Sequence, residues 1–220
     1  MMLIRHLIAV LRISGFDLKC MWKNLFFNYM CSAVKRDKGV YLYIYPNVIV
    51  SIEKTAMITL HGSLSMGIPS IKGNRRISKF LMKASSKFVV NDGCAFLDEF
   101  DVQIHQKGFF SVDNFHSNIG LEISCGQNIV LHGCVMAGRR VRIKDYNGHV
   151  VSYKGYPKSA PITIENHVWL CSGASVCPGV TISEGSVIGD NANVVSDIPI
   201  KSFVQGNPAK IIETNISWSE

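Results

Sequence analysis

The feature that most constrains the fold of this 220-residue chain is an aliphatic residue at every sixth position from Ile164 to Val194. The first positions of the blocks read Ile164, Leu170, Val176, Ile182, Ile188 and Val194, and the fifth positions read Val168, Ala174, Val180, Ser186 and Ala192. A period of six fits neither an α-helix nor a strand that would continue through Pro178 and Gly179. Blocks of one short strand and one turn, three to a coil, predict an all-β solenoid whose stacked coils form the core.

A weaker form of the same repeat lies upstream. Its first positions are Ile119, Cys125, Leu131, Ala137 and Ile143, and a further coil is indicated by Ile52, Ile58 and Leu64. Residues 88–112 are strand-like without clean sixes. Two stretches break the register: we expect the basic segment 68–85 to be an insertion, and 146–160, with two glycines and a proline, to be a projecting loop.

The first 38 residues differ in kind, because their apolar residues recur at the i, i+3, i+4 spacing of amphipathic helices. These residues are Leu3, Ile4, Leu7, Ile8 and Leu11, then Met21, Trp22, Leu25, Phe26 and Met30. We expect one or two helices that cap the open end of the solenoid, or that rest as a basic amphipathic surface on the inner membrane leaflet. The chain thus divides into a helical segment (1–38), the β-helix domain (39–205) and a C-terminal tail (206–220).

Composition narrows the classes of partner. Hydrophobic residues at 47% and charged residues at 18% fit a folded globular protein, and the net charge of +7 favours partners that carry phosphate or carboxylate. The seven cysteines are odd in number and form no CxxC pair, which indicates reduced thiols in a cytoplasmic protein, peripheral at the inner membrane face if the helices rest there. We expect no nucleic acid partner, because no zinc-finger spacing or RNA-binding motif accompanies the charge.

The stretch 161–211 resembles the carboxy-terminal half of the maltose, galactoside and polysaccharide O-acetyltransferases, members of the hexapeptide-repeat acyltransferase family. The resemblance is carried by VWL (168–170), PGVTI (178–182), SVIG (186–189), the aspartate–proline turn (197–199) and GNPAK (206–210). It implies a left-handed parallel β-helix and acetyl-CoA as the acyl donor. It also implies a homotrimer with active sites between neighbouring subunits, and transfer of acetyl to a sugar or polysaccharide hydroxyl.

The resemblance places the catalytic general base at His149, in the loop after the middle coils. A neutral imidazole suits this task, because its ordinary pKa of about 6.5 leaves it able to accept a hydroxyl proton at neutral pH. Relatives usually carry a carboxylate two residues before this histidine, where this chain has Asn147, with Asp145 two residues earlier. Either Asp145 orients the imidazole, or it is a turn residue that binds local backbone amides and the orienting carboxylate is another, such as Asp113 or Asp92.

For the donor, motif positions place coenzyme A along Ser172, Gly173, Asp190, Val195 and Lys210, with Trp169 shaping the site. Lys210 keeps a positive charge for a phosphate, whereas Asp190 stands where relatives have a small alanine. A basic cluster, Arg139, Arg140, Arg142 and Lys144, leads into the loop. It is either a solvated face or a contact for an anionic glycan or nucleotide-linked acceptor.

Other functions fit parts of the pattern. The acceptor could be an amino sugar, serine or an antibiotic, or the solenoid could be a scaffold with His149 idle. The γ-class carbonic anhydrases share this solenoid and bind zinc through three histidines. His132 and His167 have the long gap of that pattern, but no third histidine follows, so no metal is expected.

Overall fold

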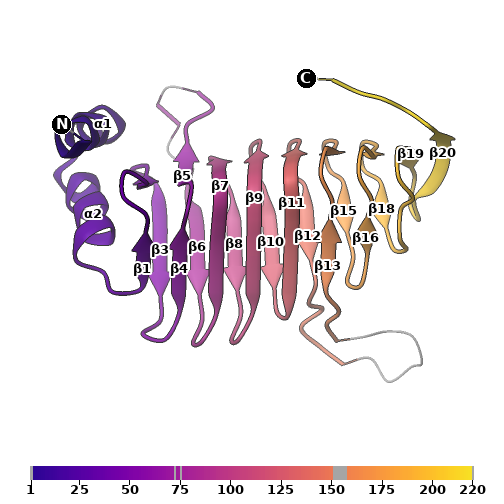
Figure 1. Ribbon diagram of the computed structural model, residues 1–220, viewed down its shortest axis with the longest axis horizontal. Coiled ribbons are helices and arrows are strands. Elements are labelled where there is room, and N and C mark those ends of the chain that lie inside the picture. The colour runs from indigo at the N-terminus through magenta and orange to yellow at the C-terminus, as the bar shows by residue number, and fades with distance from the viewer. Residues whose placement is uncertain (1, 72, 75, 151–157, 220) are drawn as a thin grey trace.

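Parallel strands stacked along one axis make up most of the chain (Figure 1). The computed structural model describes residues 2–71, 73–74, 76–150 and 158–219. Two helices, α1 (Met2–Ser14) and α2 (Leu18–Tyr29), come first. The larger sheet contains β1 (Val34–Arg36), β2 (Leu42–Ile44), β4 (Met57–Leu60), β5 (Ser63–Ile68), β7 (Lys87–Leu97), β9 (Phe109–Ser117), β11 (Asn128–Ala137), β13 (Ile162–Ile164), β14 (Val168–Leu170), β16 (Thr181–Ile182), β17 (Val187–Ile188), β19 (Ser202–Gln205) and β20 (Lys210–Thr214).

The smaller sheet contains β3 (Val48–Ile52), β6 (Ser78–Met82), β8 (Asp101–Ile104), β10 (Glu122–Cys125), β12 (Arg142–Lys144), β15 (Ser175–Val176) and β18 (Asn193–Val194). The strands within each sheet pair in parallel except β19 with β20, which pair antiparallel. In Figure 1 the nearer strands run upward and the more distant ones run downward as the chain advances from left to right, so the coils wind left-handedly. The left-handed parallel β-helix expected from the sequence is confirmed.

The six-residue repeat sets the coil length in the C-terminal half. Trp169 pairs with Val187 and Ser175 with Asn193, so one coil takes three blocks of six. The six aliphatic first positions from Ile164 to Val194 are all buried. Nearer the N-terminus Asp101 pairs with Glu122, a longer step that explains the missing sixes. Stacked phenylalanines fill these wider coils: Phe80, Phe88, Phe96, Phe100, Phe110 and Phe115 are all fully buried.

The coils have three edges, each named here by its turns in the C-terminal half. The first edge (165–167, 183–186) joins the two halves of the larger sheet, the second edge (171–174, 189–192) leads into the smaller sheet, and the third edge (177–180, 195–198) leads out of it. The loop after β12 leaves from the third edge, and the extra segment between β5 and β6 leaves from the second. Figure 1 shows these two segments on opposite sides of the solenoid.

The N-terminal end of the solenoid is covered by α2 through side-chain amides. Asn24 donates from Nδ2 to the carbonyl of Ile44 (2.7 Å) and accepts from its N–H at Oδ1 (2.9 Å). Asn28 makes the same pair of bonds with Leu42, at 2.7 and 2.9 Å. Strand β2 pairs with β5 on one side only, so these two amides satisfy backbone groups that would otherwise be buried without partners.

Three expected boundaries were wrong. The insertion predicted at 68–85 is shorter, because β6 occupies 78–82 and buries Phe80 and Met82. The solenoid begins before residue 39, since β1 pairs with β4. The tail 206–220 contributes β20 to the larger sheet. Neither helix is long and apolar enough to cross a membrane, and the same holds throughout the described part of the chain.

Candidate active site

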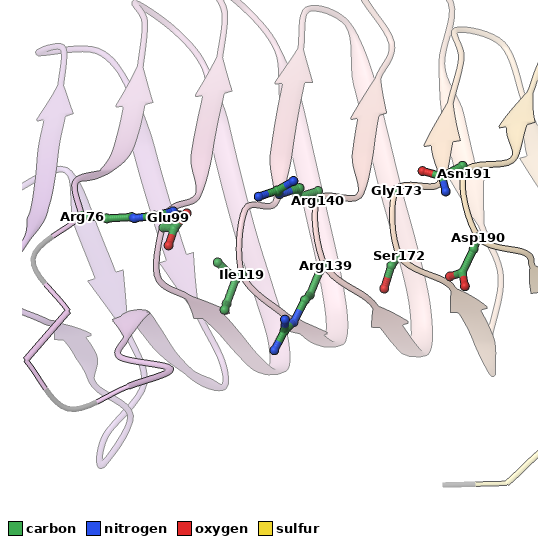
Figure 2. Close-up of a pocket in the computed structure, with 9 residues that line it drawn as sticks. All are labelled: Arg76, Glu99, Ile119, Arg139, Arg140, Ser172, Gly173, Asp190 and Asn191. Atoms are coloured by element: carbon green, nitrogen blue, oxygen red, sulfur yellow. Dashed lines mark hydrogen bonds and ion pairs between the residues drawn. The ribbon is translucent and has the colours of Figure 1, made fainter.

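A pocket of about 530 Å³ lies on the second edge, across the turns of successive coils (Figure 2). It is lined by Arg76, Glu99, Ile119, Arg139, Arg140, Ser172, Gly173, Asp190 and Asn191. Three of the six residues predicted to contact coenzyme A, Ser172, Gly173 and Asp190, therefore meet in one place. This second-edge pocket also takes in two residues of the basic cluster, Arg139 and Arg140.

The floor of the second-edge pocket is fixed by backbone hydrogen bonds between coils. The Gly173 N–H donates to the carbonyl of Arg139 (2.7 Å), and the Asn191 N–H donates to that of Ser172 (2.9 Å). Arg140, Gly173 and Asn191 all have a left-handed backbone, with φ of 56°, 73° and 57°. A Cβ on Gly173 would come within 2.2 Å of Asn191 Oδ1, so this turn requires glycine.

The charges in the second-edge pocket favour an anion. Arg76 and Glu99 form an ion pair at 2.7 Å and offset each other. Two exposed guanidinium groups, of Arg139 and Arg140, remain against the single carboxylate of Asp190. A phosphate can therefore bind at the arginine end of the pocket, away from Asp190.

His149 is exposed, on the loop that leaves the third edge. The base of that loop is closed by the bridge between Tyr146 and Ser159 and by the bond from Asn147 N–H to the carbonyl of Lys158 (2.9 Å). Of the loop predicted at 146–160, residues 151–157 lie outside the described part of the chain. The histidine thus stands just beyond a closed, anchored loop base.

Asp145 is fully buried beneath this loop and holds the preceding turn. Its carboxylate accepts the backbone N–H groups of Gly126 (2.5 Å), Gln127 (2.9 Å) and Asn128 (2.6 Å). Burial raises the pKa of Asp145, and the three amide donors act in the opposite direction. Both oxygens are engaged by the turn, and none of the contacts among the described residues joins Asp145 to His149. Its role in orienting the imidazole stays a prediction.

The other two carboxylates considered for that role lie on the first edge. Asp113 and Asp92 sit where β9 and β7 shift register between the halves of the larger sheet. Asp113 accepts from Asn91 Nδ2 (2.8 Å) and from the Gly133 N–H (2.8 Å). Burial opposes the ionisation of Asp113, yet these bonds and nearby His132 lower its pKa. Within one chain this edge is not the one that carries His149.

A smaller pocket of about 310 Å³ lies directly beneath the loop, and we call it the loop pocket. It is lined by Asp101, Gln103, His105, Glu122, Ile123, Ser124, Lys144, Tyr146, Asn147 and Gly148. His105 Nε2 lies 3.0 Å from Ser124 Oγ, and burial lowers the pKa of His105. Of these lining residues the sequence singled out Lys144, as a candidate acceptor contact, and no role was predicted for 122–124 or 146–148. The sequence signal that could have indicated this pocket is the alternation of polar and buried residues along β10 and β12.

The remaining predicted donor residues lie outside the second-edge pocket. Trp169 is 41% exposed on the outer face of β14, with the Trp218 ring 5.9 Å away and His167 stacked on Trp218 at 4.0 Å. Val195 is exposed on the third edge, and Lys210 is exposed at the start of β20. Within a single chain, three of the six predicted donor residues therefore lie together in the second-edge pocket, and the other three lie outside it.

No cluster of three or more histidine, cysteine, aspartate or glutamate side chains that could hold a metal ion occurs among residues 2–71, 73–74, 76–150 and 158–219. His132 lies on the first edge beside Asp113 (3.8 Å), and His167 bonds the carbonyl of Trp218 through Nε2 (3.0 Å). The two histidines that have the spacing of a zinc site are thus each engaged with other partners.

Sequence relatives of the chain carry a transferase name. A Saccharomyces cerevisiae protein called "Putative acetyltransferase YJL218W" is 36% identical over 104 residues, 46% of this chain and 53% of that protein. A Schizosaccharomyces pombe protein called "Putative acetyltransferase C18B11.09c" is 33% identical over 133 residues, 60% of this chain and 62% of that protein. The chain thus spans between half and two thirds of the length of these relatives. No family model matches it.

Among solved structures, the polysialic acid O-acetyltransferase OatWY aligns with 85% of this chain and 90% of its own, at 18% identity and a TM-score of 0.48. The resemblance to hexapeptide-repeat acyltransferases predicted from the sequence is confirmed by the named relatives and by the β-helix itself.

Proposed function

We propose that this chain is an acetyl-CoA-dependent O-acetyltransferase that acts on a hydroxyl of a sugar or polysaccharide, with His149 as general base. The observation that carries the proposal is the second-edge pocket, which brings Ser172, Gly173 and Asp190 together beside Arg139 and Arg140. The relatives named as acetyltransferases support acyl transfer as the reaction class.

On the donor side, the second-edge pocket suits the shape and charge of coenzyme A. The guanidinium groups of Arg139 and Arg140 can bind its phosphates, and the rigid turns at Ser172 and Gly173 offer a track for the extended pantetheine arm. Asp190 lies on the turn next to Ser172 (Figure 2). We therefore expect an uncharged part of the donor beside its carboxylate.

On the acceptor side, the loop pocket suits a polar ligand. Gln103, Glu122, Ser124 and Asn147 present hydrogen-bonding groups, and the ring of Tyr146 gives an apolar surface for a sugar face. Gly148 lines this pocket, and we infer that the exposed His149, the next residue, can reach its rim. A hydroxyl bound here would lie near the imidazole.

The proposed reaction needs one proton acceptor. A ring nitrogen of neutral His149 takes the proton of the acceptor hydroxyl as its oxygen attacks the thioester carbonyl. The carbon–sulfur bond then breaks, and the departing sulfur receives the proton back from the imidazolium. The products are the acetyl ester and free coenzyme A thiol.

The two pockets lie on different edges, which bears on assembly. His149 belongs to the third edge, and Ser172, Gly173 and Asp190 belong to the second. We therefore expect a complete site where the third edge of one protomer faces the second edge of the next. We therefore propose the homotrimer that the resemblance implies, with each site shared between two protomers.

The test is release of free thiol from acetyl-CoA against a panel of mono- and oligosaccharides. Wild type should release thiol only with an acceptor, and His149→Ala should lose about 10²-fold or more. His61→Ala, which removes an exposed histidine of the first coils, should stay close to wild type. Unchanged activity in His149→Ala would move the base elsewhere. Absence of turnover together with no coenzyme A binding by calorimetry would favour a scaffold.

A further inference from the structure

The two N-terminal helices expose an unusual number of large apolar side chains. Leu3, Ile4, Leu7, Ile8, Phe16, Leu18, Trp22, Phe26, Tyr29 and Met30 are between 37% and 78% exposed. Figure 1 places both helices at the N-terminal end of the solenoid, beyond the first coil. Exposed apolar side chains gathered on two neighbouring helices in this way indicate a site of interaction.

Apart from Tyr29, whose hydroxyl bonds His6 Nδ1 (2.8 Å), these residues are not the ones buried where the helices cover the solenoid. The buried residues of α2 are Cys20, Asn24 and Asn28, spaced by four, and they bond to the backbone of β2. In α1 the buried positions are His6, Val10 and Ser14, again spaced by four. Since the capping faces are largely polar, the cap does not account for the apolar residues on the other side of each helix.

Charge indicates what covers this surface. The first 30 residues contain Arg5, Arg12, Lys19 and Lys23 but a single acidic residue, Asp17, whose carboxylate accepts the backbone N–H groups of Lys19 and Cys20. Arg5, Arg12 and Lys19 are exposed. At about 3.6 residues per turn, Arg5 and Arg12 lie together along one side of the exposed stripe of Ile4 and Ile8 on α1.

We propose that this N-terminal apolar face docks on an anionic phospholipid bilayer. The apolar side chains enter the boundary between headgroups and acyl chains, and the exposed cations contact the lipid phosphates. A second copy of the same face is a poorer partner, because it would bring like charges together. The helices lie on the membrane and do not cross it. The inference is independent of the proposed acyl transfer.

The experiment is co-sedimentation of the full chain with vesicles of phosphatidylcholine alone and of phosphatidylcholine mixed with phosphatidylglycerol. Wild type should bind the anionic vesicles, and binding should weaken as salt rises from about 0.1 M to 1 M, where charge screening is stronger. The variant Ile4→Ser/Ile8→Ser/Trp22→Ser should bind at least about tenfold more weakly. The matched control, Ile211→Ser/Ile212→Ser, removes two equally exposed residues at the other end of the solenoid and should bind as wild type.

Melting temperatures of all three proteins serve as the folding check, because the substituted residues are exposed and should leave the core intact. Wild type should also show a blue shift of tryptophan emission with anionic vesicles that Trp22→Phe loses. Equal sedimentation of wild type and the triple variant, or no binding to anionic vesicles, would overturn the proposal. Self-association of wild type that the triple variant abolishes, without vesicle binding, would assign the face to a second copy instead.

Discussion

At the scale of single residues, Asp145 has clear structural contacts, while its predicted role in orienting His149 stays a prediction. The resemblance pointed to a carboxylate near the histidine, and Asp145 is indeed directly beneath the loop. Its oxygens nevertheless accept three backbone amides of residues 126–128. Such a carboxylate holds the turn at 126–128 beneath the start of the loop, and an effect on His149 through that turn stays a prediction.

We predict that Asp145→Asn destabilises the fold by about 2 kcal/mol, because an amide N–H would replace an oxygen that accepts backbone donors. The free energy of unfolding from urea titration measures this. Asp101→Asn is the control, since its ion pair with Lys79 is half-exposed and contributes little. A variant as stable as wild type, with a shifted pH–rate profile, would instead favour direct orientation of His149.

At the scale of elements, the sequence predicted the strands well wherever the period of six was kept. Each first position from Ile164 to Val194 is buried, because a regular coil has no freedom to place them elsewhere. The prediction failed where the coils widen. Ser78–Met82 was taken for an insertion, because its neighbours Arg75 and Arg76 are basic and its phase does not match the sixes.

The helices were predicted from their apolar stripes, and both are present, but the face of each helix that meets the solenoid was not predicted. Amphipathic spacing reveals which residues share a face and not which face is buried. One edge of β2 has backbone N–H and C=O groups that no neighbouring strand pairs with. Asparagine amides can bind such groups, whereas leucine and phenylalanine side chains cannot. The polar face of α2 therefore turns inward.

The N-terminal cap should weaken in mild acid. His6 is buried, stacked on Tyr41 at 4.0 Å and bonded to the Tyr29 hydroxyl at 2.8 Å. Burial and then Arg36 lower its pKa to about 4. The unfolded chain, with an ordinary pKa near 6.5, binds the proton first, so stability present above about pH 6.5 is lost as pH falls toward 4.

The measurement is the melting temperature between neutral pH and pH 5 for wild type and His6→Phe, which keeps a ring against Tyr41. The variant should lose less stability on acidification than wild type. The control His61→Phe alters an exposed histidine and should keep the wild-type pH dependence. Parallel curves for wild type and His6→Phe would show that His6 does not couple the cap to pH.

At the scale of the whole molecule, the solenoid divides the proposed reaction between two edges. The second edge holds the second-edge pocket, where we propose that the donor binds, and the third edge holds the loop with His149. The repeat predicted the coils, and the motif positions predicted Ser172, Gly173 and Asp190. The loop pocket and the position of Arg139 in the second-edge pocket could not be predicted. Both depend on which turns lie next to each other in successive coils, and the period of six alone does not determine that.

Complementation tests most directly whether His149 of one protomer and the second-edge pocket of its neighbour form one acetyl transfer site, as we propose. Two variants, His149→Ala and Arg139→Glu/Arg140→Glu, should each be nearly inactive in thiol release. When both are co-expressed and assemble at random, about a quarter of the shared sites contain two intact halves, so about a quarter of wild-type activity should return. Activity that stays at the level of the separate variants, in trimers shown to contain both chains, would contradict the shared site.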